Sequence, residues 1–305
     1  AKRTEKIPCG ESVVGAFPMM WTGNEEKGLC FFYQSRANWS ADKAKTYRFE
    51  KSGEAFTVTV SIAKGLPAGK PYSVEFGLLA TPMRPLAANH PFNTFNGNSK
   101  SAQLNRPYGR PVQDVVLMSY PGKGSGDLGS FFCDLDEPAF KVDRKNHLWV
   151  MDNHARGARV RAVPYTCARF LSSFYPEVRA FLPEWTFSPE CALDYSHTGH
   201  FLYECCPKSS ATEFFIWKYK TMLDLIPGMK GIYLDFGLIH ECSNKEHGCH
   251  ESMAILAQRE FYRRLAVAQI EKGIADPVTV IHSTDCVQPP AMTFVTHLFN
   301  GEHIR

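Results

Sequence analysis

The stretch KGIYLDFGLIHECSNKEHGCH, residues 230–250, decides how the second half of the chain folds. It predicts a short buried strand from Gly231 to Leu234, followed at once by the carboxylate of Asp235. A carboxylate just beyond a buried strand is costly to keep charged unless something pairs with it. The loop that follows holds three histidines and two cysteines. The stretch is therefore compatible with a catalytic strand end, a metal site or a loop pinned by a disulfide.

Short apolar runs alternate with helical stretches on both sides of this segment. Such an alternation predicts parallel strands with crossover helices, and in a barrel of about eight units the chemistry lies at the C-terminal strand ends. Six units are visible, so we expect a (β/α)8 TIM-type barrel that is truncated at the C-terminus. The predicted strands are residues 115–120, 160–166, 201–206, 231–235, 278–283 and 294–299, and the predicted helices are residues 146–157, 209–228 and 253–272.

The first part of the chain has a different rhythm. Between Val13 and Thr81, β-rich runs alternate with a period of two and are separated by Gly, Asn, Lys and Pro clusters, which is typical of an antiparallel β-sandwich. Proline and glycine concentrate at RPYGRPVQD, residues 106–114. We therefore expect a sandwich accessory domain over residues 1–110 and the incomplete barrel over residues 111–305.

Composition excludes several classes of protein. The 305 residues carry a net charge of only +3 and no basic run, so a nucleic-acid partner is not expected. No apolar run approaches the roughly 18 residues that a membrane span needs. The first ten residues are neither a methionine start nor a signal peptide, so we expect the sequence to begin inside a longer chain. Ten scattered cysteines favour an extracellular or periplasmic location. No organic cofactor is implied, and the oligomeric state is not determined.

Hydrolysis of a glycosidic bond usually needs two carboxyl groups. Asp235 is the first candidate, as nucleophile or orienting base, and its alternative is an ordinary capping or ion-paired residue. Glu302, directly after the sixth strand, is the proposed acid, and the other acidic candidates are Asp285, Glu241 and Glu204. A separation of about 5–5.5 Å between the two carboxyl groups predicts retention of configuration, and about 6.5–9.5 Å predicts inversion.

A sugar also needs an aromatic surface and a few polar groups to hold its hydroxyls. Tyr165, near the end of the second strand, and Trp185, in the PEWTF segment, are the expected platforms. His282 ends the fifth strand and His240 lies in the loop after the fourth, so both are candidate substrate ligands together with Asp285.

The cysteine and histidine cluster allows three interpretations. Cys242, His247 and Cys249 offer the thiolate and imidazole ligands that zinc prefers, but the C-x6-C spacing is not a standard zinc spacing. A disulfide between Cys242 and Cys249 needs only that the loop turn back on itself, which Gly248 allows. Free thiols are the third alternative.

A series of motifs runs along most of the chain, at residues 17–32, the following SRANW, and residues 76–85, 161–166, 205–209, 231–249, 280–283 and 299–302. In this order they resemble the glycoside hydrolase family 123-like group, large proteins with an N-terminal β-sandwich and a catalytic (β/α) barrel. The resemblance implies hydrolysis of a glycosidic bond, with an adjacent Asp-Glu pair and a substrate acetamido group in the characterised branch. Here Asp235 is followed by Phe236, so the Glu of that pair is missing.

The sequence therefore predicts a glycosidase that acts on an oligosaccharide or polysaccharide. Two alternatives stay open. One is a carbohydrate-binding protein without catalysis, because the Asp-Glu pair is absent. The other is a metal-dependent hydrolase built on the cluster from His240 to His250.

Overall fold

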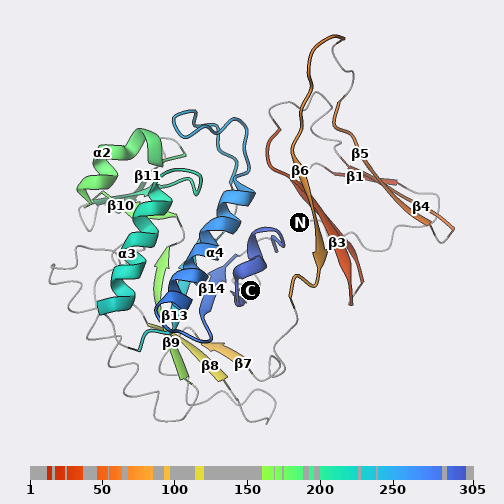
Figure 1. Cartoon of the computed structure of the whole chain (residues 1–305). Helices are drawn as coiled ribbons and strands as arrows, with labels where there is room; N and C mark the ends of the chain where they lie inside the picture. Colours follow the sequence, from red (N-terminus) through yellow and green to blue (C-terminus); the bar gives the residue numbers. More distant parts are fainter. Residues whose placement is uncertain are drawn as a thin grey trace.

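Two β-rich layers and one α/β layer make up the part of the chain that the structure describes (Figure 1). The structure is a computed structural model. Within the described residues, no helix is long and apolar enough to cross a membrane. The described residues are 12–15, 18–24, 26–36, 47–53, 55–63, 68–84, 93–96, 114–119, 160–167, 169–173, 175–187, 192–195, 200–225, 228–237, 240–283 and 287–299.

The N-terminal strands form two three-stranded antiparallel sheets, as the period of two predicts. Phe31 of β3 and Tyr47 of β4, one from each sheet, meet edge to face with ring centroids 5.8 Å apart. Apolar side chains of both sheets therefore share one core. The first sheet has the order β1-β4-β5, from Ser12–Gly15, Tyr47–Ser52 and Ala55–Val60, and the second has the order β2-β3-β6, from Met19–Gly23, Gly28–Tyr33 and Phe76–Thr81.

The centre of the second part is a six-stranded parallel sheet. The apolar strand β13 lies in the middle of this sheet and covers Gly231 to Asp235, as the sequence predicts. It pairs with β9 on one side and with β14 on the other. Gly231 is required there, because a Cβ would come within 2.0 Å of the Val278 carbonyl oxygen. The strand order is β15-β14-β13-β9-β8-β7, from His297–Phe299, Val278–His282, Gly231–Asp235, Val160–Cys167, Asp114–Ser119 and Asn93–Asn96.

One predicted domain boundary and one predicted strand differ from the structure. The strand β7 lies in the range expected to belong to the sandwich, so the parallel sheet starts at Asn93, before the proline-rich segment. The predicted strand 201–206 is instead β12, His200–Glu204, in a separate antiparallel sheet with β10, Phe170–Ser172, and β11, Ala192–Tyr195. The apolar run of this segment could not show to which sheet it belongs, because a buried strand has the same apolar pattern in a parallel and in an antiparallel sheet. The predicted helix 146–157 lies outside the described residues.

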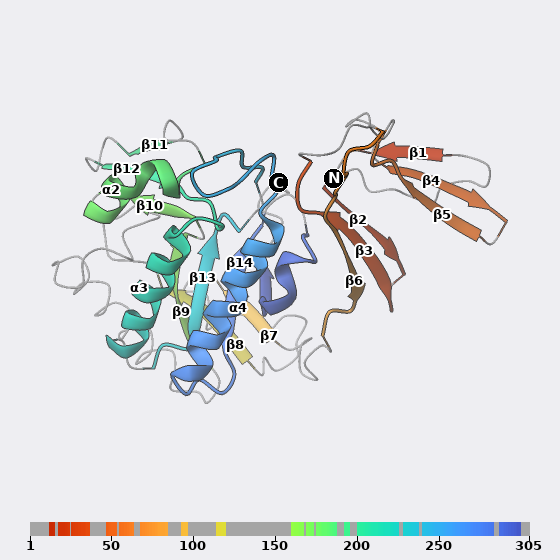
Figure 2. The same cartoon turned by 45° about the horizontal axis from the view of Figure 1, so that its top comes forward.

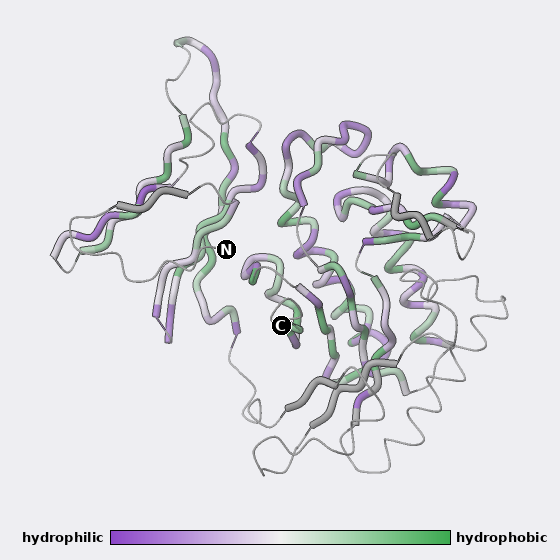
Figure 3. The backbone as a smooth tube through the Cα atoms, turned by 180° about the vertical axis from the view of Figure 1, so that it is seen from behind, coloured by the Kyte–Doolittle hydropathy of each residue, from purple (hydrophilic) through white to green (hydrophobic). Residues whose placement is uncertain are grey.

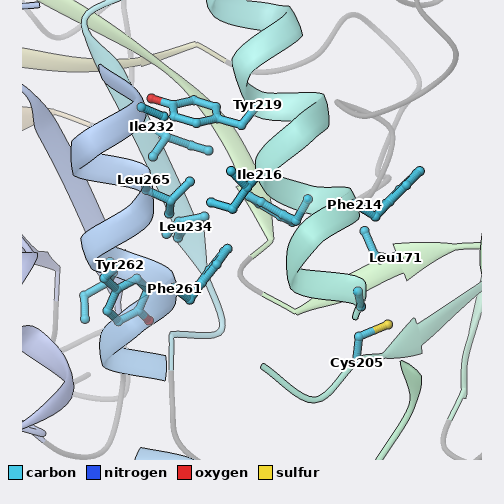
Figure 4. Packing of buried hydrophobic residues seen from close by; sticks show 14 of the residues in the cluster. Leu171, Cys205, Phe214, Ile216, Tyr219, Ile232, Leu234, Phe261, Tyr262 and Leu265 are labelled. Atoms are coloured by element: carbon cyan, nitrogen blue, oxygen red, sulfur yellow. The ribbon is translucent and has the colours of Figure 1, made fainter. Parts of the chain in front are cut away.

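Three helices and a short 3-10 turn complete the described elements. Helix α2 covers Pro176–Trp185, α3 covers Ala211–Leu225, α4 covers Ile255–Glu271, and the turn η5 covers Ala291–Phe294. Helices α3 and α4 lie side by side on one face of the parallel sheet (Figures 1 and 2). Phe215 of α3 and Phe261 of α4 pack edge to face at 4.9 Å. Figure 4 shows Ile216 of α3 and Leu265 of α4 beside Ile232 and Leu234 of β13, in the same buried cluster.

The side chains of β13 point alternately into the helical core and to the opposite face of the sheet. Ile232 and Leu234 point into the helical core, whereas Tyr233 packs with Tyr165, Val163 and Val280 in a different cluster. Because successive strand residues point to opposite faces, Asp235 lies on the side of Tyr233, away from the helices. A site at the end of β13 can therefore form on the face of the sheet that α3 and α4 do not cover.

The central position of β13 leads to a stability prediction. Ile232 is fully buried, so Ile232→Ala should lower the free energy of unfolding by about 2–5 kcal/mol. Ile270→Ala is the matched control, since Ile270 on α4 is 59% exposed and its truncation should change stability by no more than about 0.5 kcal/mol. Urea unfolding of both variants measures the difference, and equal effects would contradict the assignment of β13 as the core strand.

Candidate active site at the end of the parallel sheet

Three neighbouring strands bring three side chains together at the carboxyl edge of the sheet. Tyr165 comes from β9, Asp235 from β13 and His282 from β14, and the registers Tyr233↔Tyr165 and Leu234↔Ile281 place their strand ends level. The hydroxyl of Tyr165 donates to Asp235 Oδ2 at 2.5 Å. His282 Nδ1 lies 2.9 Å from Asp235 Oδ1. The structure thus assembles three residues that the sequence predicted as parts of one site.

The carboxylate of Asp235 is held in its ionised form. Its side chain is only 18% exposed, and burial alone would raise its pKa. The hydrogen bonds from His282, from Tyr165 and from the backbone N–H of Phe236 at 2.8 Å outweigh burial, and the pKa of Asp235 is lowered. A carboxyl group of this kind can act as nucleophile or stabilise positive charge, but it is a poor proton donor at neutral pH.

The backbone directly after Asp235 adopts an unusual conformation. Phe236 has a φ of 53°, in the left-handed region that bulky residues rarely adopt. Its ring packs edge to face against Phe170 at 5.0 Å, and Gly237 N–H donates to the His282 carbonyl at 2.9 Å. These contacts hold the strained residue and turn its N–H toward the Asp235 carboxylate. Strain of this kind is often found at functional sites.

A second charged cluster lies beyond the carboxyl ends of the same strands. Arg169 follows β9, and its Nε lies 2.7 Å from Glu204 Oε1 in an almost buried ion pair. His240 Nδ1 lies 3.2 Å from the same oxygen, and His240 Nε2 lies 2.9 Å from an Arg169 guanidinium nitrogen. Burial and then the charge of Arg169 lower the pKa of His240, against the opposite effect of Glu204. The imidazole is therefore neutral near pH 7 and 44% of its side chain is exposed, which suits a hydrogen-bonding ligand for a sugar hydroxyl.

The two predicted aromatic platforms need correction. Trp185 ends α2 and is 4% exposed, and its indole N–H donates to Ser210 Oγ at 2.7 Å inside the helical core. It therefore offers no free face to a sugar. Tyr165 is 8% exposed and stacks on Tyr233 at 5.2 Å, so its role is to hold Asp235.

The expected second carboxylates have different outcomes. Glu302 and Asp285 lie outside the described residues. Glu241 forms an ion pair with Arg36 of the N-terminal layer. Glu204 forms an ion pair with Arg169.

Sequence reasoning missed two contributors. Arg169 carried a signal, since it is a lone cation directly after a predicted strand, in the position where site residues gather. Cys206 was visible only as half of a Cys-Cys pair, and nothing in its spacing linked it to residues some forty positions later.

The loop after β13, residues 240–252, is named here the Cys/His loop. The cysteines in the described part of the chain are all free thiols, so of the three interpretations the structure does not show the candidate disulfide between Cys242 and Cys249. Both thiols instead lie with His247 and Cys206 in one group whose ligand atoms are within 4.8 Å of one another. This group is a candidate metal centre beside the carboxylate site.

No protein-family model and no curated protein sequence matches the chain. The chain is similar to a GH36 α-galactosidase from Geobacillus stearothermophilus, in complex with 1-deoxygalactonojirimycin, with a TM-score of 0.50 and 9% identity over 97% of this chain and 47% of that chain. It is also similar to the galactosidase domain of an α-galactosidase-sucrose kinase (TM-score 0.49, 10% identity, 99% of this chain and 47% of that chain). A GH31 sulfoquinovosidase from E. rectale gives a TM-score of 0.48 with 12% identity over 90% of this chain and 42% of that chain.

These three structures are more than twice as long as the part matched, since the chain spans less than half of each. The first likeness shows a fold shared with a glycoside hydrolase. It does not extend to the glycoside hydrolase family 123-like group in particular. The likeness is therefore one of fold alone.

The hydrogen bond from Tyr165 leads to a prediction for Asp235. Tyr165→Phe removes one donor to the carboxylate, so the pKa of Asp235 should rise toward its ordinary value. A carboxylate with a lowered pKa stabilises the fold above its unfolded pKa, and this stability is lost as the pH falls through the folded pKa. In Tyr165→Phe the folded pKa lies closer to the unfolded one, so the contribution of Asp235 to stability should be smaller and its loss should be complete at a higher pH.

Carbon-13 NMR titration of the Asp235 carboxyl group measures this pKa directly. Tyr219→Phe is the matched control, because the buried Tyr219 hydroxyl has no hydrogen-bond partner among the described residues. Its removal should leave the pKa of Asp235 unchanged. An unchanged pKa in Tyr165→Phe as well would contradict the proposed role of that hydroxyl.

Proposed function

We propose that the chain is a glycoside hydrolase that uses Asp235 as its ionised catalytic carboxylate. The observation that carries the proposal is the position of Asp235. Three hydrogen bonds fix this carboxylate at the carboxyl edge of a parallel sheet, on the face opposite to α3 and α4. An ionised carboxylate in a fixed place is one of the two groups that glycosidic hydrolysis needs.

The proposed architecture is a (β/α) barrel of which the six-stranded sheet is the larger part. In such a barrel the helices lie outside and the active site lies at the C-terminal strand ends. Helices α3 and α4 cover one face of the sheet, and Tyr165, Asp235 and His282 occupy the other. The N-terminal sheets would form an accessory sandwich packed against the barrel.

Glu302 is the proposed acid, since it follows the strand β15 by three residues and β15 lies next to β14. A sugar between the two groups would be an oligosaccharide or polysaccharide, with His240, His282 and Asp285 as further ligands. We also propose that the chain belongs to the glycoside hydrolase family 123-like group and that the protein is exported from the cytosol. The free thiols of the described cysteines lend the export no support.

Substitution of Asp235 tests the proposal. Asp235→Asn should lower kcat/KM toward an activated aryl glycoside by about 10³-fold or more, because the amide cannot supply the negative charge. Asp224→Asn is the matched control: Asp224 on α3 is exposed and pairs with Lys272, so this variant should keep full activity. A sugar that binds the unsubstituted chain and Asp235→Asn equally, with no turnover in either, would overturn hydrolysis in favour of a binding protein.

The pH profile gives an independent check. Activity requires the ionised form of Asp235, and its pKa is lowered, so the acid limb of kcat/KM should fall below the ordinary carboxyl range near 4. In Tyr165→Phe the same limb should move to higher pH. A limb that does not respond to this substitution would show that another group controls it.

A further inference from the structure

Four side chains from distant parts of the sequence converge beside the active-site strands. Cys206 precedes α3, and Cys242, His247 and Cys249 belong to the Cys/His loop. Their ligand atoms all lie within 4.8 Å of one another. The three cysteines are each 1% exposed.

The distances within this cluster are those of a tetrahedral metal site. Zn–S bonds of about 2.3 Å at tetrahedral angles place two sulfurs about 3.8 Å apart. Cys206 Sγ and Cys249 Sγ are 3.9 Å apart, whereas a disulfide needs about 2.05 Å. His247 Nε2 lies 3.2 Å from Cys242 Sγ. The cluster is therefore too open for a disulfide and close to the size that a zinc ion requires.

The imidazole of His247 already has the orientation of a metal ligand. Its Nδ1 lies 2.5 Å from the carbonyl oxygen of Glu184 at the end of α2. A carbonyl only accepts, so Nδ1 carries the proton and the lone pair of Nε2 faces the cysteines. A hydrogen bond of this kind from the second ring nitrogen is what fixes metal-bound histidines in proteins.

The composition of the Cys/His loop also indicates that the loop needs a cross-link to be stable. Figure 3 shows the loop before α4 as largely hydrophilic. Its small buried cluster consists of three cysteines and Ala254, with Phe187 and Ala257 partly buried against it. A segment of this kind cannot form a core of its own. Bonds to a metal would supply the missing folding energy.

We propose that Cys206, Cys242, His247 and Cys249 bind one structural zinc ion. Three thiolates and one imidazole form a common structural zinc set, and all four positions are filled by the protein. A closed site has no open position for water or substrate, so the ion supports the fold and does not catalyse hydrolysis. The proposed centre therefore replaces the metal-dependent hydrolase considered from the sequence.

The zinc-bound loop would also carry the contact with the N-terminal layer. Ser35 pairs with Ser252 as an antiparallel bridge, and Ser252 forms a second bridge with the ligand Cys242. Arg36 N–H donates to the Glu251 carbonyl at 3.1 Å, and Met253 N–H donates to the Gln34 carbonyl at 2.8 Å. Figures 1 and 2 show this loop between α2 and the N-terminal strands. Zinc would therefore stabilise the domain interface as well as the loop.

Metal analysis of the unsubstituted chain is the first test. Expression with zinc in the medium and elemental analysis after gel filtration should give about one zinc per chain. Zinc-edge X-ray absorption should fit three sulfurs at about 2.3 Å and one nitrogen at about 2.0 Å. Metal-free folded protein, or a mass lower by two hydrogens from a disulfide within the cluster, would overturn the proposal.

Cysteine variants locate the site. Cys249→Ser should lower the zinc content several-fold and lower the melting temperature, because a hydroxyl is a poor zinc ligand. Cys205→Ala is the matched control: Cys205 is adjacent to Cys206 and buried, but its thiol contacts the Tyr203 carbonyl and is not part of the cluster. It should keep about one zinc per chain. Equal zinc content in both variants would contradict the assignment, whatever their stability.

Hydrogen exchange tests the link to the interface. Removal of zinc from the unsubstituted chain with a chelator should increase exchange at the Arg36 and Met253 amides, which both cross between the layers. The amides of β13, in the core of the sheet, should remain protected and serve as the internal control. Unchanged exchange at Arg36 and Met253 after zinc is lost would show that the interface does not depend on the ion.

Discussion

The site depends on one constraint: the carboxyl ends of β9, β13 and β14 lie at the same height in the sheet. Gly231 allows β13 to approach β14 closely, and the parallel registers then bring Tyr165 and His282 to either side of Asp235. A nearly buried carboxylate would be protonated or unstable without such donors. With them it is ionised and fixed in direction. The same pairing that builds the sheet therefore prepares the charge that hydrolysis requires.

The loop after β13 adds a second level of organisation. One end of it follows the strand that carries Asp235, and its other end reaches the N-terminal strands through Glu251 and Ser252. The His247 imidazole and the three thiols near it lie at the base of this loop. A closed metal centre there would connect three parts of the molecule: the sheet end, the α2 region and the accessory layer. Structural and chemical roles are then divided between two adjacent clusters.

The sequence could predict the features that depend on local pattern. The period of two revealed the antiparallel sheets, and the run GIYLD placed Asp235 at a buried strand end. Features that depend on distant pairing were not accessible. The strand β12 has the same apolar character as a parallel strand but pairs in an antiparallel sheet, and Trp185 looked like a loop platform although it ends a helix and fills the core.

The same limit applies within the metal cluster. Spacing along the chain argued against zinc, because the usual zinc motifs have cysteines two to four residues apart. Cys206 supplies the missing ligand from before α3, and only the fold brings it to the loop. Asp235 and His282 were each predicted at a strand end of one site, because the carboxyl ends of parallel strands meet at one edge, whereas no spacing rule connects a loop with one cysteine elsewhere.

The most direct test of the central claim is the response of Asp235 to a cationic sugar analogue. A protonated iminosugar resembles the positively charged transition state of glycosidic cleavage and should pair with an ionised carboxylate at the anomeric centre. The account predicts saturable binding by calorimetry, a shift of the Asp235 carboxyl carbon signal on binding, and a loss of affinity of about 100-fold or more in Asp235→Asn. Equal affinity in the two proteins, with no change in the Asp235 signal, would contradict it.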